Sequence, residues 1–289
     1  MDIYIENEHL RVSFSSKGAE LQHITGIDSE TEYLWSGDAK HWPKFSPVLF
    51  PIIGALKENS YQFEGETYVL PRHGFARDMD FEVEKISDLE ILFILKSTPE
   101  TLKDYPFEFK LGLRYKLTKA TVCCTYEISN PSPKELLFSI GGHPAFAAPL
   151  NRQGKYTDYY LQFNADDKLT YHEIEDNLIS DKTITLNLDD KKLFLKHQLF
   201  YNDALVIKNL KSNSISLMNT KNYNGINFKF ENFPYFGIWA AKDAEFICLE
   251  PWCGIADSIN HNQQLKDKEG IIVLEPHGEW QRSWEVTCF

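Results

Sequence analysis

The sequence predicts an all-β fold, a large antiparallel β-sandwich. Most segments alternate apolar and polar residues with a period of two, in short runs rich in Tyr, Phe, Val, Ile and Thr. Gly, Pro, Asn, Asp or Ser separate these runs, as is typical of strands joined by turns. The runs show no repeat of the length of a propeller blade. We therefore expect two large sheets packed face to face.

The expected strands form three series along the chain, and each combines β-branched or aromatic residues with this alternation. The first series comprises residues 3–5, 10–15, 19–25, 61–63, 67–70, 81–86 and 90–97. The second comprises 107–118, 121–129 and 135–141, with a hairpin turn at 118–120. The third comprises 159–163, 169–173, 183–186, 204–207, 214–219, 226–230, 235–240, 246–250, 271–274 and 279–286.

Helical periodicity is scarce, and we expect only a turn or two at residues 98–105, 191–199 and 261–265. No Gly/Ser-rich linker or low-complexity tract divides the 289 residues. Large β-sandwiches reach this length as one unit, so we expect a single domain over residues 1–289.

The composition favours a globular protein that acts on a small molecule. Hydrophobic residues make up 43% of the chain, which is enough to build a substantial core. The net charge of −12 disfavours nucleic acid and anionic membranes as partners. The first residues do not resemble a signal peptide, and no apolar stretch is long enough to span a bilayer. These features predict a cytoplasmic protein, a monomer or homodimer.

The five cysteines are an odd number, and Cys123 adjoins Cys124 in an expected strand. This pattern favours reduced, structural thiols over a disulfide framework. Cys248 and Cys253 are too isolated from other ligands to suggest a zinc site.

The first stretch that gathers polar groups is LPRHGFAR, residues 70–77. It places Arg72, His73 and Arg77 around a glycine after an expected strand. Such a group is a candidate binding loop. The alternative is a basic surface loop whose charges are solvated.

The second stretch is FSIGGHPAF, residues 138–146, where an apolar run ends at two glycines. Glycine permits close approach of a ligand or another chain segment, and Pro144 fixes the chain direction after His143. The pattern indicates a positioned histidine. The alternative is a strand that ends in a turn with a solvated histidine.

The third stretch is FICLEPWCG, residues 246–254, in which Glu250 closes an apolar run. Apolar surroundings raise the pKa of a carboxyl group toward the range useful for proton transfer. Pro251 is expected to end the strand, and Trp252 offers a flat face to a sugar ring. The alternatives are a carboxylate facing water and a tryptophan packed in the core.

Other site chemistries find little support in the sequence. Two histidines and a carboxylate can ligate zinc or iron, but no HxH or HExxH spacing accompanies them. The sequence lacks GxSxG, GxxxxGK[ST] and GxGxxG, which excludes serine hydrolases, P-loop nucleotide hydrolases and dinucleotide-dependent dehydrogenases. We expect no metal.

Together and in this order, the three stretches resemble the aldose 1-epimerase (mutarotase) family, most closely its LacX-like branch. The resemblance rests on RHGFAR at 72–77, GGHPAF at 141–146 and LEPW at 249–252. The opening strands and the closing run from 274 to 284 also resemble the two ends of the family, so the similarity covers essentially the whole chain.

The resemblance implies a β-sandwich of the galactose mutarotase type, with the site on one concave sheet face and no metal or organic cofactor. It implies Glu250 as general base and His143 as general acid. The family also uses an aspartate between the second histidine and the glutamate. The substrate-binding residues that we expect are Arg72, His73, Arg77, Asp203 and Trp252.

The expected activity is the interconversion of α and β anomers of a hexose, free or 6-phosphorylated. The better-known galactose mutarotases have Asn-His and Glu-Pro-Gln where this chain has Gly-His and Glu-Pro-Trp, so the sugar stays open. Arg72 and Arg77 form a phosphate fork in one interpretation. In the other, one of them pairs with Asp78, Asp80 or a ring hydroxyl.

Two rival functions stay open at this point. The first is a non-catalytic carbohydrate-binding protein on the same fold. The second is a lyase or glycosidase, which needs a second paired carboxylate or a tyrosine base at the site. The sequence shows no clear candidate for that role, and it leaves Asp203 and Tyr235 open.

Overall fold

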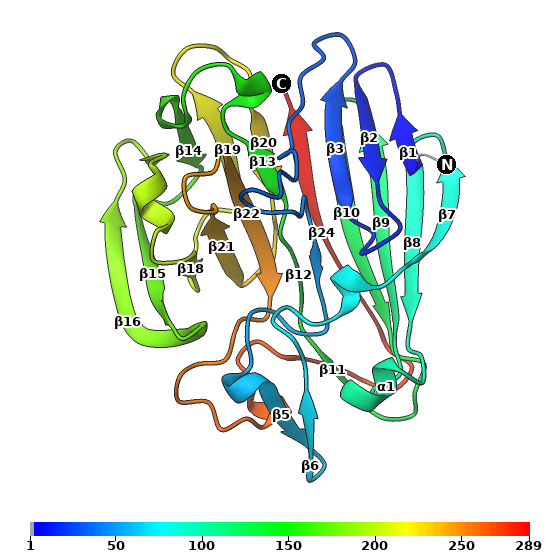
Figure 1. The fold of residues 1–289 in the computed structure, drawn as a ribbon. Coiled ribbons are helices and arrows are strands. Elements are labelled where there is room, and N and C mark those ends of the chain that lie inside the picture. Colours follow the sequence, from blue (N-terminus) through cyan, green and yellow to red (C-terminus); the bar gives the residue numbers. More distant parts are fainter. Residues whose placement is uncertain (1–2) are drawn as a thin grey trace.

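The computed structural model describes residues 3–289, and strands are its dominant secondary structure (Figure 1). The first strands are β1 (Ile3–Glu6), β2 (Leu10–Phe14), β3 (Leu21–Gly26), β4 (Val48–Leu49), β5 (Ser60–Phe63), β6 (Glu66–Val69), β7 (Glu82–Ser87), β8 (Glu90–Lys96), β9 (Lys110–Thr118), β10 (Thr121–Ser129), β11 (Leu136–Phe138), β12 (Ile140–Gly142) and β13 (Ala145–Ala147). They are followed by β14 (Tyr159–Phe163), β15 (Lys168–Glu175), β16 (Leu178–Asn187), β17 (Lys192–Phe194), β18 (Leu205–Ile207), β19 (Ser214–Asn219), β20 (Ile226–Lys229), β21 (Tyr235–Trp239), β22 (Phe246–Cys253), β23 (Ile272–Leu274) and β24 (Glu279–Cys288).

The helices are single turns between strands. They are α1 (Thr101–Asp104) and the 3₁₀ helices η1 (Lys57–Asn59), η2 (Ala76–Asp78), η3 (Leu150–Arg152), η4 (Tyr156–Asp158), η5 (His197–Phe200) and η6 (Leu265–Asp267). In the described chain, no helix has the length and apolar character needed to cross a membrane.

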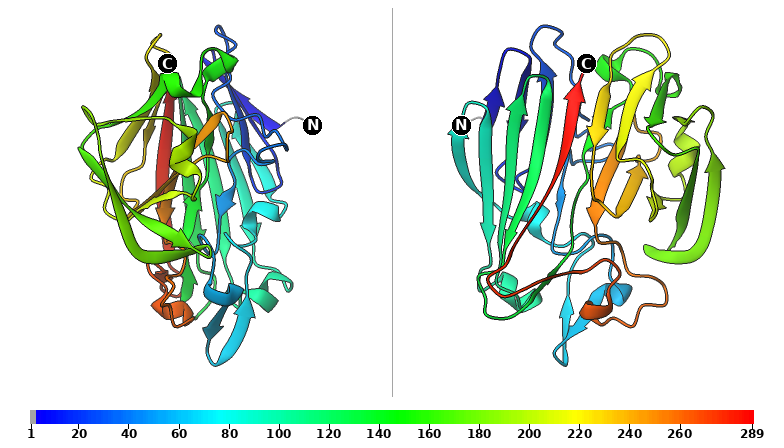
Figure 2. Two further views of the ribbon diagram at one scale, coloured as in Figure 1. Left: turned by 60° about the vertical axis from the view of Figure 1, so that its left-hand side comes forward. Right: turned by 180° about the vertical axis from the view of Figure 1, so that it is seen from behind.

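Two large antiparallel sheets dominate the structure, which confirms the all-β sandwich. The nine-stranded sheet has the order β17-β14-β19-β20-β24-β10-β9-β8-β7. The second has the order β16-β15-β18-β21-β22-β12-β4, with β13 paired to β22. In the right-hand view of Figure 2, which is seen from behind, the first sheet is the broad layer nearer the viewer, and the small hairpin β5–β6 projects below the sheets in Figure 1.

The core fills the space between these sheets with aromatic side chains. Phe228 on β20 lies 5.7 Å from Phe146 on β13 and 6.5 Å from Phe236 on β21, measured between ring centroids. It also lies 5.3 Å from Trp284 on β24 of its own sheet. Aromatic pairs at these separations add to the stability supplied by burial of apolar area.

Strand β22 is buried along its whole length and lies in the middle of the second sheet. It pairs with β21 on one side and with β12 and β13 on the other. Because side chains alternate along a strand, Leu249 faces the sandwich core while Glu250 and Trp252 face the opposite side. Trp252 belongs to a second, smaller apolar cluster with Leu49 and Val206.

Two glycines on neighbouring strands make room for Trp252. A Cβ atom on Gly141 of β12 would lie 2.6 Å from the indole Cδ1, and one on Gly237 of β21 would lie 2.6 Å from Cη2. The indole of Trp252 therefore lies over β12, β22 and β21, in a trough where glycines on β12 and β21 leave room for it. One of the glycines that the sequence marks out at 141–142 thus serves the packing of Trp252.

Most strands follow the expected ranges, and 121–129, 159–163 and 214–219 match them residue for residue. The expected hairpin turn after residue 118 is confirmed, since β9 and β10 pair across it. The expected turn at 98–105 contains α1, and that at 261–265 appears only as η6, which begins at residue 265.

The prediction that Pro251 ends its strand is wrong, because β22 continues to Cys253. The backbone N–H of Leu249 donates to the carbonyl of Pro144, between β12 and β13. Backbone N–H groups two residues apart point to the same side of a strand. The nitrogen of Pro251 thus faces the break between β12 and β13, where a missing donor is tolerated.

Two further expectations need correction. Residues 135–141 form two strands, because the chain passes from the β23 ladder to the second sheet at Ser139. The helical turns expected at 191–199 are wrong for the first part of that range, which β17 occupies. Leu193 and Leu195 are buried whereas Phe194 is 40% exposed, so the period here is two.

We expect Gly141→Ala to lower the free energy of unfolding by about 1–3 kcal/mol, as is usual when a packed core receives an extra group. The new methyl group would meet both the indole of Trp252 and the carbonyl oxygen of Pro251, at 2.6 and 2.9 Å. Denaturant unfolding followed by tryptophan fluorescence measures the change. The control is Gly112→Ala on β9, where the nearest atoms to the new group are side-chain atoms of Glu127 and Leu92 at 3.3 Å. A cost at Gly112 as large as that at Gly141 would contradict the close fit of Trp252 against Gly141.

Candidate active site

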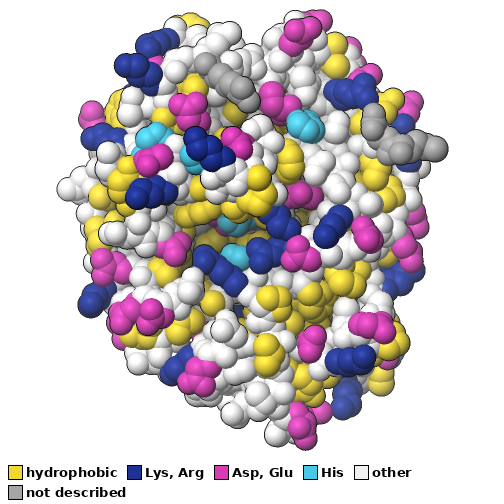
Figure 3. All heavy atoms as spheres, in the orientation of Figure 1, with side chains coloured by type: hydrophobic (Ala, Val, Ile, Leu, Met, Phe, Trp, Pro, Cys, Tyr) yellow, Lys and Arg dark blue, Asp and Glu magenta, His cyan; other side chains and the backbone are white. Residues whose placement is uncertain are grey.

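A cavity of about 490 Å³ opens on the face of the second sheet that carries Glu250. Figure 3 shows it as a hollow near the middle of the molecule, where arginine and histidine side chains gather. All seven residues that the sequence singles out line this cavity, although they come from four separate segments: Arg72, His73, Arg77, His143, Asp203, Glu250 and Trp252.

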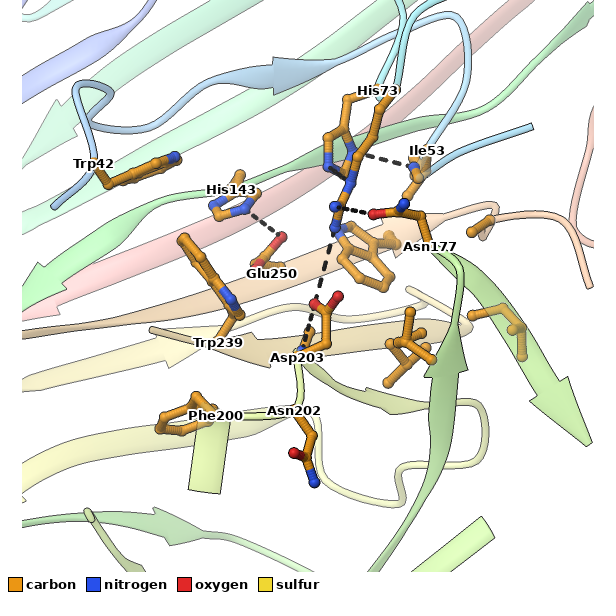
Figure 4. Close-up of a pocket in the computed structure, with 18 of the residues that line it drawn as sticks. Trp42, Ile53, His73, His143, Asn177, Phe200, Asn202, Asp203, Trp239 and Glu250 are labelled. Carbon is orange, nitrogen blue, oxygen red and sulfur yellow. Dashed lines mark hydrogen bonds and ion pairs between the residues drawn. The ribbon is translucent and has the colours of Figure 1, made fainter. Parts of the chain in front are cut away.

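The closest contact between the two expected catalytic residues is 3.3 Å, from Nε2 of His143 to Oε2 of Glu250 (Figure 4). Both side chains are buried, with exposed fractions of 10% and 2%. The two groups therefore form a direct pair in the cavity wall.

The sheet ladder holds His143 in this position. Its residue lies directly after β12, its backbone N–H donates to the carbonyl of Pro47, and Pro144 accepts from Leu249 of β22. A Cβ atom on the preceding Gly142 would lie 2.6 Å from the hydroxyl of Tyr126, so only glycine fits there. This explains why two glycines precede the histidine.

Two tryptophans that the sequence analysis did not select enclose the imidazole. Trp42 stacks on His143 with ring centroids 4.8 Å apart, and Trp239 meets its edge at 5.5 Å. Trp42 and Trp239 also contact each other edge to face at 5.5 Å. Trp239 ends β21, the strand next to β22, and its position at the end of an expected strand could have marked it as a candidate site residue. Trp42 lies in a loop whose path the sequence does not reveal.

Burial shifts both members of the pair toward their neutral forms. It raises the pKa of Glu250 well above its usual value, and the negative charge of Asp203 acts in the same direction. Burial, aided by the positive charges of Arg72 and Arg77, lowers the pKa of His143 to about 3. Both shifts favour a neutral pair, in which a protonated Glu250 lies beside a neutral imidazole.

His73 lies across the cavity, with its ring 6.0 Å from that of His143. The backbone N–H of Gly54 donates to Nδ1 of His73 at 3.1 Å. Burial lowers the pKa of His73 well below its usual value, so the ring is neutral and its proton belongs on Nε2. Nε2 is then a hydrogen-bond donor toward the cavity.

Arg72 joins three segments around the cavity. Its Nη1 donates to Oδ1 of Asn177, in the turn between β15 and β16, at 3.0 Å, and its Nη2 lies 3.9 Å from Oδ1 of Asp203 (Figure 4). Its Nε lies 3.3 Å from Nε2 of His73. Asn177 was not expected from the sequence, since a residue in a distant hairpin turn gives no local signal.

Arg77 lies behind Arg72 on the same loop. Its Nη2 donates to the carbonyl oxygen of Arg72 at 2.8 Å, and its Nε lies 3.6 Å from Oδ2 of Asp78. Asp78 is also bound by Nζ of Lys44 at 2.8 Å. Arg77 therefore has a carboxylate partner, as expected if one arginine pairs with Asp78 and does not bind a phosphate. Its side chain nevertheless lines the cavity.

The expectation that Cys248 is remote from other metal-ligand types is wrong. Its sulfur, one ring nitrogen of His143 and one carboxylate oxygen of Glu250 lie within 4.8 Å of one another. The reason is strand periodicity, because Cys248 and Glu250 are two residues apart on β22 and share a face. All five cysteines are free thiols, as expected.

Residues 1–286 match the family model described as aldose 1-epimerase. The chain belongs to the aldose 1-epimerase family. It is 32% identical to the chromosomal LacX protein of Lactococcus lactis subsp. lactis over 305 aligned residues, which cover 99% of both chains.

Solved structures agree with this membership. The galactose mutarotase related enzyme of Lactobacillus acidophilus superposes with a TM-score of 0.95 at 33% identity, covering 100% of this chain and 97% of that one. The galactose mutarotase-like protein of Lactobacillus casei gives a TM-score of 0.91 at 29% identity and full coverage of both chains. The fold of this aldose 1-epimerase family member is thus the galactose mutarotase type that the sequence resemblance implied.

We expect Glu250→Gln to stabilise the protein at pH 8 and to have less effect near pH 4.5. The raised pKa means that folded Glu250 binds a proton more tightly than unfolded Glu250, so wild-type stability falls as pH rises above the unfolded value. The amide of the variant stays neutral at every pH, and the difference should grow by up to about 1.4 kcal/mol per pH unit.

Urea unfolding between pH 4.5 and 8 measures this difference. Glu245→Gln, at an exposed carboxylate one residue before β22, controls for loss of a charge at the surface. A stability difference between Glu250→Gln and wild type that does not change with pH would contradict the neutral pair.

Proposed function

We propose that the chain is an aldose 1-epimerase that interconverts the α and β anomers of a hexose, free or 6-phosphorylated. The observation that carries the proposal is the 3.3 Å contact between His143 Nε2 and Glu250 Oε2 at the cavity. The C1 hydroxyl and the ring oxygen O5 of a hexose are bonded to the same carbon. A base and an acid that serve them must therefore both reach the same edge of the sugar, and the cavity volume suits a small ligand.

The reaction needs one proton removed and one proton supplied. Glu250 as carboxylate removes the proton of the C1 hydroxyl while His143 as imidazolium donates a proton to O5, so the C1–O5 bond breaks and an aldehyde forms. Rotation about C1–C2 presents the other face of the carbonyl. Neutral His143 then takes back the O5 proton as O5 attacks C1, and protonated Glu250 returns a proton to O1.

The buried pair can supply both forms that this cycle uses. In its neutral form Glu250 holds the proton; transfer across the 3.3 Å contact gives the carboxylate and the imidazolium. Arg72 favours the carboxylate through its positive charge, although it also disfavours the imidazolium. The pair of carboxylate and imidazolium acts on the closed sugar ring. After ring opening, protonated Glu250 and neutral His143 are present with the open-chain sugar.

The remaining cavity groups match the needs of a sugar. His73 offers an Nε2 donor, Arg72 offers a cation held by Asp203, and the tryptophans around His143 offer apolar faces. Trp252 is mostly buried in its trough and supplies the apolar floor rather than a free stacking face. We propose that these groups hold the sugar with C1 and O5 above the His143–Glu250 pair.

Anomer exchange measured by NMR tests the proposal on galactose, glucose and their 6-phosphates. We expect the enzyme to accelerate exchange of at least one of them. Glu250→Gln and His143→Asn should each lower kcat by about 10²–10⁴-fold, because each removes one proton transfer. Binding of the sugar to Glu250→Gln should persist.

A protein that binds sugar without accelerating any exchange would instead support the non-catalytic carbohydrate-binding function. Absence of both binding and exchange with all four sugars would sink the epimerase proposal.

We expect Arg77→Ala to separate phosphorylated from free hexoses. If Arg77 contacts a 6-phosphate, KM for the phosphorylated sugar should rise roughly tenfold or more, since arginine binds phosphate through charge-assisted hydrogen bonds. KM for the free sugar should stay within about twofold. The matched control is Lys44→Ala, which removes the other cation beside Asp78 without changing a residue of the cavity. Equal effects of Arg77→Ala on both sugars would favour a structural Arg77–Asp78 pair.

A further inference from the structure

We propose that His143, Cys248 and Glu250 form a binding site for a thiophilic divalent cation such as Zn²⁺, which inhibits the protein by occupying its proton-transfer pair. Binding of the ion stands on the geometry alone. Inhibition rests on the proposed epimerase function.

The three ligand types and their spacing fit tetrahedral zinc. One nitrogen, one sulfur and one carboxylate oxygen lie within 4.8 Å of one another, and the nitrogen and oxygen of the His143–Glu250 contact are 3.3 Å apart. In a tetrahedral site with bonds of about 2.0–2.3 Å, neighbouring ligand atoms are roughly 3.3–3.7 Å apart. The sulfur therefore has to approach by no more than about 1 Å.

The ligands come from rigid, paired backbone. Cys248 is opposite Ala145 of β13 and Trp239 of β21, and Glu250 is opposite Gly237 of β21. Binding therefore needs side-chain rotation without movement of the strands. A preorganised set of this kind loses little conformational freedom when it binds an ion.

The imidazole presents Nε2, which already lies 3.3 Å from Oε2 of Glu250, to the ion. Its Nδ1 has no hydrogen-bond partner among the residues that the structure describes, and the side chain is 10% exposed. Stacking on Trp42 holds the plane of the ring without engaging either nitrogen. His143 and Glu250 also line the cavity, which supplies an entry path and an open fourth position for water.

The charge count favours a divalent, sulfur-binding ion. Zn²⁺ binding displaces the protons of buried Cys248 and Glu250. The resulting thiolate and carboxylate carry two negative charges and neutral His143 carries none, so Zn²⁺ forms a site with no net charge beside Arg72 and Arg77. Mg²⁺ prefers six oxygen ligands, and this set offers too few. Thiolate and imidazole ligands favour zinc, cadmium and similar ions.

Zn²⁺ and Cd²⁺ titrations of the purified full chain test the site. We expect one Zn²⁺ per chain by calorimetry, and sulfur-to-cadmium charge-transfer absorption on addition of one equivalent of Cd²⁺. Cys248→Ser should abolish the absorption and weaken Zn²⁺ binding by roughly tenfold or more, and Glu250→Gln should also weaken it. Cys123→Ser, at the partly exposed thiol of β10, is the matched control and should keep both signals. Mg²⁺ should not bind.

Failure of wild type to bind Zn²⁺, or loss of the Cd²⁺ signal in Cys123→Ser instead of Cys248→Ser, overturns the site. If Cys248→Ser does not fold, unchanged Zn²⁺ affinity in Glu250→Gln overturns it on its own. Anomer exchange with added Zn²⁺, scaled to the activity of each protein without metal, then tests inhibition and its reversal by a chelator. A chain that binds Zn²⁺ but never exchanges anomers contradicts the proposed function while leaving the ion site intact.

Discussion

The pairing of β22 with its neighbours is the constraint on which the rest of the site depends. The strand is buried from end to end, and its two faces serve different purposes. Leu249 and its alternate neighbours pack between the sheets, whereas Cys248, Glu250 and Trp252 face the cavity side. A shift of one residue in register would bury the carboxylate in the sandwich core and expose leucine in the cavity, so the ladder fixes the chemistry as well as the fold.

The same burial determines the electrostatics of the site. A carboxylate and an imidazolium at 3.3 Å attract each other, but taking two charges out of water costs more than this attraction returns unless other groups help. Burial therefore favours the neutral pair, and Arg72 offsets part of this preference at Glu250. Under the proposed function the pair has to reach the ionic form as well, because each group of an acid/base pair must exist in both protonation states during one cycle.

Much of this site could be predicted from the sequence, because its key residues lie in short segments of unusual composition. Glu250 after an apolar run and His143 after two glycines are local signals, and the structure brings both to one cavity. Trp42, Asn177 and the proximity of Cys248 to His143 depend on how distant loops and strands come together, which local patterns do not encode. The prediction at Pro251 was wrong because proline usually ends a strand, whereas here its nitrogen faces the break between β12 and β13.

The contact between Arg72 and His73 bears on sugar binding under the proposed function. Nδ1 of His73 accepts from Gly54, so Nε2 carries the proton and is itself a donor. Arg72 Nε, also a donor, lies 3.3 Å away, and two donors gain nothing from facing each other. A sugar oxygen placed between them accepts from both and removes this mismatch. Under the proposed function, these two donors are a binding point for one sugar oxygen beside the pair that would carry the chemistry.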